Sequence, residues 1–355
     1  MSLQISIFRD LPCIHRRDMK GLRKKIENLR VSVLPDFYFD RIISLPSLNH
    51  FFMRTRKKAA SGGGNLRGFL QTEVKGGNAT NLAFALASLS VKTDLYCIGD
   101  ELTQAALSKH PPTCDVRIIP GRPAYTAALE FPFNGKLVNV MVSDVGDVST
   151  FDGRQLNGRH MEGLRKSDCV ALVNWSSNRK GNALARRVFN REGRPRLNFL
   201  DPADLEGAEE RVKELVKNVI GKGLVDVLSL NENETRIIAR LLSVRRLPQS
   251  YDAEDIVAVS GALSDRLRVI VDIHTPIGSA TATTRGQFWQ PASGRVAGFL
   301  TGAGDCWDAG DVVGHLLDFN PRYRLQFANV CAHLHLRRGS KPFPTLGEVT
   351  TFLGS

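Results

Sequence analysis

The stretch that most directly suggests chemistry is a run of small residues that ends in a carboxylate and opens an apolar segment, Thr301 to Asp305. If that segment is a helix, its first backbone N–H groups are free and, with the helix dipole, form a site for a phosphate group. Gly302 and Gly304 let the backbone approach the anion closely. Asp305 can accept a proton from an attacking hydroxyl. These features predict phosphoryl transfer to an alcohol; a tight turn before a helix is the alternative for so short a motif.

A second constellation lies far upstream, where two glycines open another apolar helical stretch. Gly76 and Gly77 can bring backbone amides against a ligand. Asn78 and Thr80 are candidate helix caps, and Asn81 falls in the first turn with an amide that can grip hydroxyls. A capped core helix without a ligand is the alternative interpretation.

A carboxylate follows the first predicted strand. Residues 31–34 form a short apolar run that indicates a buried strand, and the chain then continues to Asp40. Open α/β sheets bind ligands just outside the carboxyl ends of their strands. We therefore expect Asp40 to face a ligand at that edge.

Together these residues resemble the ribokinase-like (PfkB) carbohydrate kinase family, from about Val31 to the C-terminus. Four pieces occur in the family's order: the strand leading to Asp40, the Gly-Gly…Asn turn at residues 76–81, an Asn-x-x-Glu element at residues 231–234, and the motif at residues 301–305. Residues 327–332 are also similar to the family's adenine-side helix. The resemblance implies an α/β fold with a mostly parallel central sheet, helices on both faces and a small β-sheet lid.

The resemblance also implies four groups of site residues. The catalytic group has a general base and three residues that supply anion-binding amides: Asp305, Gly302, Ala303 and Gly304. The substrate-binding group is Asp40, Gly76, Gly77 and Asn81. The nucleotide-binding group is Gly278 and Asn329, and the pair that holds Mg²⁺ through water is Asn231 and Glu234.

The chain is therefore expected to be a small-molecule kinase that transfers the terminal phosphate of ATP or ADP to a hydroxyl of a sugar or sugar-like substrate. A nucleoside kinase or a sugar-phosphate kinase of the same fold is an alternative. A non-catalytic sensor that binds a nucleotide or sugar is another, because the segment where the family carries its nucleotide loop reads differently here. Residues 272–278 include an aspartate, a histidine and a proline in that loop.

A second departure concerns potassium. The family usually carries an Asp and a Thr before its Thr-Gly-Ala-Gly-Asp motif, and this chain has Phe299 and Leu300 there. That Asp belongs to a monovalent-cation loop in many members, so the resemblance does not imply potassium activation. Asp308, one turn after Asp305, is assigned to the helix and not to a second base.

The layout alternates strands and helices, as expected for a mostly parallel sheet. Residues 1–30 form a basic N-terminal extension with a short helix over 20–29, and residues 31–355 form the kinase domain. Two segments, about 41–75 and 122–143, show β-like alternation without intervening helices. By the resemblance these segments form the lid, which in many members also makes a homodimer contact.

The net charge of the sequence is +12, and part of this excess is local. Residues 54–58 include four basic residues and precede a predicted flexible hinge or hairpin tip, residues 59–64. A solvated surface is one interpretation of this cluster. The other is that these residues, or Arg67, reach over the site to hold an anionic substrate such as a sugar phosphate. No aromatic-interleaved basic motif favours nucleic-acid binding.

Composition favours a cytoplasmic enzyme with no membrane partner. The longest uncharged apolar stretch, residues 78–91, is shorter than the about 20 residues that a membrane span needs. The six cysteines form no CxxC pair, which favours buried thiols in a reducing compartment. The particular substrate is left open by the sequence.

Overall fold

The computed structural model describes residues 16–189, 195–244, 251–294, 302–338 and 342–354. Phe299, Leu300 and Thr301 lie outside these ranges, as do residues 1–15 of the predicted extension. Within the described part, residues 16–28 form a helix where the sequence predicts one. No helix among the described residues is long and apolar enough to cross a membrane.

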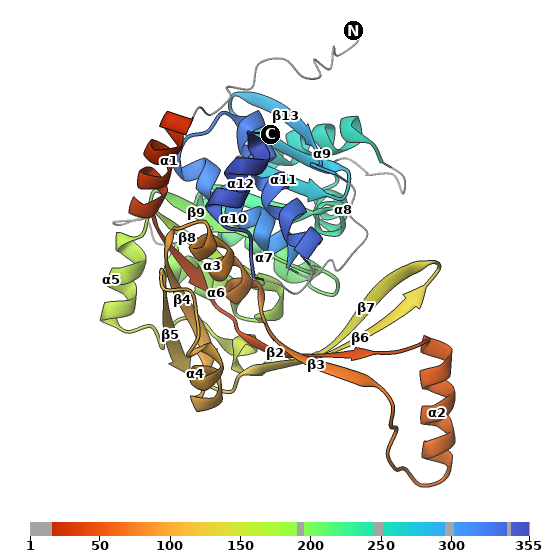
Figure 1. The fold of residues 1–355 in the computed structure, drawn as a ribbon. Coiled ribbons are helices and arrows are strands. Elements are labelled where there is room, and N and C mark those ends of the chain that lie inside the picture. The colour runs from red at the N-terminus through yellow and green to blue at the C-terminus, as the bar shows by residue number, and fades with distance from the viewer. Residues whose placement is uncertain (1–15, 190–194, 245–250, 295–301, 339–341, 355) are drawn as a thin grey trace.

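A nine-stranded sheet forms the centre of the molecule, with strand order β13-β12-β11-β10-β9-β8-β1-β4-β5 (Figure 1). The strands from β5 to β11 run parallel, and the β12–β13 hairpin continues the sheet antiparallel. Their bounds are β1 (Arg30–Leu34), β4 (Lys92–Gly99), β5 (Cys114–Pro120), β8 (Cys169–Leu172), β9 (Leu197–Leu200), β10 (Val227–Asn231), β11 (Ile270–Thr275), β12 (Gly278–Thr283) and β13 (Gly286–Pro291). The chain leaves β1 toward β4 and β5 and later continues from β8 in the other direction, so the order reverses beside β1.

Helices cover both faces of this sheet and bury two hydrophobic cores against it. One core includes residues of α5 (Gly158–Lys166), α6 (Gly181–Val188), α7 (Glu209–Asn218), α8 (Glu232–Leu241) and α9 (Ala253–Leu267). The other includes residues of α1 (Arg16–Asn28), α3 (Asn78–Ser88), α4 (Glu101–Leu107), α10 (Ala303–Leu316), α11 (Pro321–Arg338) and α12 (Leu346–Leu353). Three 3₁₀ turns complete the described elements: η1 (Gly146–Thr150), η2 (Trp175–Ser177) and η3 (Ile220–Lys222).

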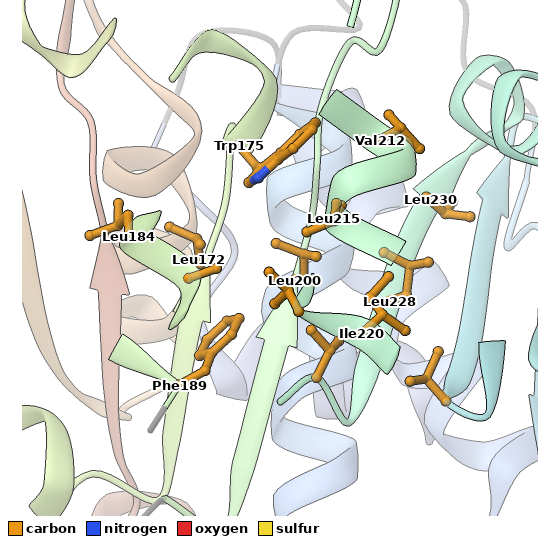
Figure 2. Packing of buried hydrophobic residues seen from close by; sticks show 14 of the residues in the cluster. Leu172, Trp175, Leu184, Phe189, Leu200, Val212, Leu215, Ile220, Leu228 and Leu230 are labelled. Carbon is orange, nitrogen blue, oxygen red and sulfur yellow. The ribbon is translucent and has the colours of Figure 1, made fainter. Parts of the chain in front are cut away.

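The alternation of side chains along each strand assigns apolar residues to the two cores. In β8, Val170 and Leu172 belong to one core, whereas Ala171 belongs to the other. Figure 2 shows Leu172 and Leu200 packed in the first of these cores. Both faces of the parallel strands are therefore buried, as their continuous apolar runs predict.

A second, four-stranded sheet extends from the body as a lid, with strand order β3-β2-β6-β7 (Figure 1). Its strands are β2 (Tyr38–Ser44), β3 (Leu70–Gly76), β6 (Ala124–Phe133) and β7 (Lys136–Asp144). The predicted mostly parallel sheet with helices on both faces and a small β lid is therefore confirmed.

One prediction about the lid is wrong. Residues 41–75 were expected to lack helices, but α2 (Leu48–Ala60) connects β2 to β3 at the far end of the lid (Figure 1). Ser47 caps this helix by accepting a hydrogen bond from the N–H of His50 at 3.1 Å. The helix buries no residue, although Leu48, Phe51 and Phe52 lie at helical spacing in its first half. Residues 59–60 belong to its last turn and are not a hairpin tip.

A buried charged cluster ties α10 and α11 to β11. The Arg324 guanidinium donates to Asp272 at 2.7 Å, to Asp311 and to the hydroxyl of Thr281 at 2.7 Å. Asp272, Asp311 and His315 have ligand atoms close enough for a metal ion. Because Arg324 supplies the positive charge between these groups, we interpret the cluster as an ion-pair network that fixes the two helices on the sheet.

Candidate active site

A cavity of about 740 Å³ lies at the carboxyl edge of the parallel strands, between the body and the lid. Its wall includes Asn174 after β8, Asp201 after β9 and Asn231 at the end of β10, together with lid residues such as Asp40 and Thr126. This edge, next to the reversal of strand order, is where open α/β sheets place their ligands. The cavity therefore lies where the sequence predicts a site.

Asp305 lies in the first turn of α10 and faces this cavity. Asn78 and Asn81 each donate a side-chain N–H to one of its carboxylate oxygens, both at 2.9 Å. Burial raises the pKa of Asp305 to about 8, against the lowering effect of the two asparagine hydrogen bonds. A carboxylate with this pKa is a stronger base than an ordinary aspartate. The two asparagine hydrogen bonds fix its orientation.

The N-terminus of α10 has no side-chain cap. Its N-cap residue is Gly302, which has a positive φ of 79° and contributes only its carbonyl, to the N–H of Cys306 at 3.0 Å. The N–H groups of Ala303, Gly304 and Asp305 therefore have no partner within the helix. Gly302, Gly304 and Asp305 all line the cavity. This end of the helix can bind an anion.

Three of the four predicted substrate-binding residues line the cavity: Asp40, Gly77 and Asn81. Asp40 accepts a hydrogen bond from Thr126, and burial raises its pKa to about 6. It lies within β2 and not at the end of the first strand, because β1 ends at Leu34 and the chain re-enters a strand in the lid.

The glycine pair has a steric role that the sequence did not indicate. A Cβ on Gly76 would lie 1.8 Å from an Oδ atom of Asp40, so only glycine leaves room for that carboxylate. Gly77, with a φ of 101°, occupies the N-cap of α3. The predicted capping by Asn78 and Thr80 is therefore wrong: Asn78 reaches Asp305, and Thr80 donates to the backbone carbonyl of Asp36 at 2.9 Å.

Asp36 and Asn174 support this side of the cavity and were not singled out from the sequence. The fully buried Asp36 accepts from the N–H of Ala79 at 2.7 Å and from the amide of Asn174 at 2.6 Å. Burial raises its pKa to about 6. Since the first of these bonds fixes the start of α3, Asp36 helps to position the asparagines that hold Asp305.

The predicted metal pair forms a capping box at the start of α8. The side chain of Asn231 accepts from the N–H of Glu234 at 3.0 Å, and the carboxylate of Glu234 accepts from the N–H of Asn231 at 2.8 Å. Burial and the nearby charge of Asp201 raise the pKa of Glu234 well above its ordinary value. Asp201 and Asp204 line the same part of the cavity. This all-oxygen set, crowded with negative charge, fits Mg²⁺.

Behind Asp201 lies Asp308, which is fully buried in α10. Ser229 donates to its Oδ1 at 2.6 Å, and Asp201 and Asp308 are hydrogen-bonded through their carboxyl groups. Burial and then the charge of Asp201 raise the pKa of Asp308 well above its ordinary value. Asp308 is thus a helix residue, as predicted, and it binds Asp201, which was not predicted as a site residue.

The predicted nucleotide-binding residues lie away from the wall of the cavity. The amide of Asn329 uses all four of its hydrogen-bonding positions on the protein: it accepts from Ser279 and Trp307, both at 2.8 Å, and donates to the carbonyls of Gln290 and Pro291 at 3.2 and 3.0 Å. These four hydrogen bonds indicate a structural role for Asn329. Gly278 begins β12, where a Cβ would lie 2.5 Å from the carbonyl oxygen of Gln290.

The basic cluster also lies away from the cavity. Residues 54–58 belong to α2, at the far end of the lid, and Arg54 donates to the carbonyl of Arg67 at 2.9 Å (Figure 1). The described residues that line the cavity include six carboxylates and neither lysine nor arginine. Within one chain, the described structure therefore gives no support for an anionic substrate held by this cluster.

The doubly wound sheet and the lid beside its carboxyl edge define a ribokinase-like fold. The structure is similar to the ribokinase of Thermotoga maritima, with a TM-score of 0.70 and 16% identity over 92% of this chain and 100% of that one. It is also similar to the Arabidopsis thaliana ribokinase solved with ribose and ATP, with a TM-score of 0.64 and 18% identity over 92% and 99% of the two chains. The predicted ribokinase-like fold is confirmed.

In sequence, the chain is similar to a ketohexokinase of Haloferax volcanii. The two are 25% identical, over 94% of this chain and 93% of that protein. A nucleoside kinase of Methanocaldococcus jannaschii is a further structural neighbour, with a TM-score of 0.59 and 13% identity over 91% and 97% of the chains. No protein-family model matches the chain.

Proposed function

We propose that this protein is a small-molecule kinase that transfers the terminal phosphate of a nucleotide to a hydroxyl of a neutral, sugar-like substrate. The observation that carries the proposal is the position of Asp305, a buried carboxylate of raised pKa beside the uncapped N-terminus of α10. A base and an anion-binding site lie next to each other there. Phosphoryl transfer to an alcohol needs both.

The charge of the cavity favours a neutral acceptor over a sugar phosphate. Six carboxylates and neither lysine nor arginine occur among the described lining residues. A second phosphate on the substrate would meet uncompensated negative charge there, whereas hydroxyl groups can donate to carboxylates such as Asp40. The ketohexokinase relative agrees with a sugar acceptor.

In the proposed mechanism, Asp40 and Asn81 bind substrate hydroxyls on the lid side of the cavity. Asp305, oriented by Asn78 and Asn81, takes the proton of the attacking substrate hydroxyl. The hydroxyl oxygen forms a bond to the terminal phosphorus while the bond from that phosphorus to the bridging oxygen of the donor breaks, and the nucleotide leaves with one phosphate fewer and the negative charge on that oxygen. The N–H groups of Ala303 to Asp305 stabilise the charge on the transferring phosphoryl group. The lid covers the cavity and keeps water from competing with the substrate.

Asn231, Glu234 and Asp201 are the residues that would hold Mg²⁺ in this site. The ion, when bound, supplies positive charge that neutralises the donor phosphates. Burial and the charge of Asp201 raise the pKa of Glu234. Negative charge is therefore crowded around Glu234, and this crowding supports the assignment of a cation to the site. ATP is proposed as the donor, with ADP as the alternative.

The lid is proposed to pair with the lid of a second copy of this chain. Val140 and Val142 are 49% and 62% exposed and alternate along β7 with Met141 and Ser143, which line the cavity. They therefore lie on the face of the lid that points away from the cavity, together with Tyr125, which is 42% exposed. A contiguous apolar face of this kind marks an interaction surface. A homodimer would bury it.

The protein is also proposed to act in the cytoplasm. Cys97, Cys114, Cys169, Cys306 and Cys331 are buried free thiols. Burial raises the pKa values of these thiols, so they are inert packing residues suited to a reducing compartment.

The proposed function is tested by a phosphotransfer screen of the purified protein. ATP and ADP serve as donors, with and without Mg²⁺, against neutral sugars, nucleosides and sugar phosphates. We expect Mg²⁺-dependent turnover that is fastest with a neutral sugar. Preference for a sugar phosphate would contradict the argument from cavity charge. Binding of nucleotide or sugar without turnover on any acceptor would favour the sensor interpretation.

A further inference from the structure

His274 is a residue of the cavity wall that the proposed mechanism does not use. It lies near the carboxyl end of β11 and lines the cavity. Its ring packs on Trp307 of α10, with the ring centroids 5.1 Å apart and a tilt of 33°. A Cβ built on Gly304 would lie 3.2 Å from Cε1 of His274. The imidazole is therefore held against the first turn of α10, where the unpaired N–H groups are.

The ring nitrogens of His274 can form hydrogen bonds beside the first turn of α10. Among the described residues, none forms a hydrogen bond with its ring nitrogens. Burial lowers the pKa of His274 to about 4, so the ring is neutral near pH 7 and carries one N–H and one lone pair. A neutral donor suits a site that already contains several carboxylates, because it adds no ion that must be desolvated or paired.

The chemistry of the cavity gives this donor a role. A phosphoryl group at the start of α10 would meet the backbone N–H groups on one side and His274 on another. The side-chain amides of Asn78 and Asn81 each donate one N–H to Asp305, and Asn81 is assigned to substrate hydroxyls. The described lining residues include neither lysine nor arginine. His274 is the lining side chain that packs on Gly304 and still has an N–H to donate.

We propose that His274 donates a hydrogen bond to the phosphoryl group bound at the N-terminus of α10, and so acts as a catalytic residue of the kinase reaction. This inference rests on the proposed function. The hydrogen bond strengthens as negative charge develops on the phosphoryl oxygens, so its loss should lower kcat more than it changes the KM of the nucleotide.

The first test separates the N–H group of His274 from the packing of its ring. His274→Phe keeps a planar ring against Trp307 and removes the donor, whereas His274→Gln keeps an N–H donor of similar reach. We expect kcat of the Phe variant to fall about 10²-fold, the usual effect of losing one such donor. The Gln variant should recover much of this loss, while both variants unfold at the temperature of the wild type.

Full turnover by a folded His274→Phe variant would overturn the inference and leave the proposed kinase function intact, because the wild type is active in the same assay. Loss of turnover in the Phe and Gln variants alike, with lowered unfolding temperatures, would overturn it too, since it would assign His274 to packing alone.

A second test does not depend on turnover. The ¹⁵N resonances of the His274 imidazole, assigned by their loss in His274→Gln, are followed while Mg²⁺ and tripolyphosphate are added to the full-length protein. We expect the protonated ring nitrogen to shift with tripolyphosphate, which has phosphoryl groups but no adenine. A shift that occurs with ATP and not with tripolyphosphate would place His274 at the base or ribose and overturn the assignment. No shift with either would also overturn it.

Discussion

At the scale of single residues, Asp305 owes its chemistry to its surroundings. Burial raises its pKa, and the amides of Asn78 and Asn81 lower it while they fix both oxygens. Nearby Asp36 and Asp201 add negative charge that raises the pKa further. The result is a base with a pKa of about 8, suited to proton abstraction near neutral pH.

This pKa predicts how stability depends on pH. The folded-state pKa of Asp305 is about 8 and its ordinary value is 3.8, so the folded state binds more protons between these values. This contribution to stability is therefore complete below about pH 3.8, falls as pH rises, and is lost above about pH 8. We expect the unfolding temperature of the wild type to drop between about pH 4 and 8 and then to level off, and that of Asp305→Asn to drop less over this range. Parallel curves for the two proteins, measured without Mg²⁺, would contradict the raised pKa.

Sequence reasoning at this scale found the residues that lie inside motifs. Asp305, Asn81 and Asp40 line one cavity, although 265 positions separate Asp40 from Asp305 in the chain. It did not find Asn174 or His274 as cavity residues. Each lies at or near the carboxyl end of a strand that reaches the cavity only through the order of strands in the sheet, and no local pattern encodes that order.

At the scale of elements, Asn329 and Arg324 of α11 both bind the hairpin β12–β13. Asn329 of α11 binds Ser279, Trp307 and two carbonyls of β13, so its amide connects three segments. Trp307 also packs on the ring of His274. The hydrogen bond from Trp307 to Asn329 therefore helps to position a residue of the cavity wall. The resemblance to kinases suggested nucleotide contact for Asn329, and the contacts assign it a structural role.

Asn329→Ala should therefore destabilise the protein without impairing nucleotide binding. It leaves the buried donors of Ser279 and Trp307 unpaired, which costs about 1–3 kcal/mol for each such group. We expect a lower urea midpoint and a nucleotide KM that changes less than about threefold. Asn65→Ala, at an exposed position, is the control. A tenfold rise in KM (about 1.4 kcal/mol) with unchanged stability would restore the nucleotide-binding role.

The elements that sequence reasoning predicted well are those that bury an apolar face. The strands β1, β8 and β10 appear as short apolar runs, and α7 and α8 have apolar residues at helical spacing. The helix α2 was missed although Ser47 caps it and Leu48, Phe51 and Phe52 lie at helical spacing, because its apolar residues are few and its second half is basic. In the lid, alternation predicted β6 and β7 but could not exclude a helix between β2 and β3.

At the scale of the whole molecule, the proposed contact between two copies of the chain lies on the lid. The proposed dimer would cover the outer face of β7, where Val140 and Val142 are exposed. Because the same strand lines the cavity through Met141, pairing of two lids would also stiffen the wall of the active site. The substrate side of the cavity would then depend on association.

Two aspartates on the outer face of the lid should abolish pairing. We expect the Val140→Asp, Val142→Asp double variant to have the mass of one 39.2 kDa chain by light scattering, and the wild type to have twice that mass. Charged groups at the centre of an apolar interface are costly to desolvate. Leu102→Asp is a control, because Leu102 is 62% exposed on α4 in the body. A monomeric wild type, or a double variant that remains dimeric, would contradict the proposed contact.

The proposed kinase reaction depends most on Asp305 as the base beside the N-terminus of α10. Single-turnover phosphotransfer by the wild type and by Asp305→Asn, at saturating nucleotide, Mg²⁺ and the preferred acceptor, tests this role. We expect a rate about 10²–10⁴-fold lower in the variant, with acceptor binding retained. A variant that transfers phosphate at nearly the wild-type rate would contradict this role.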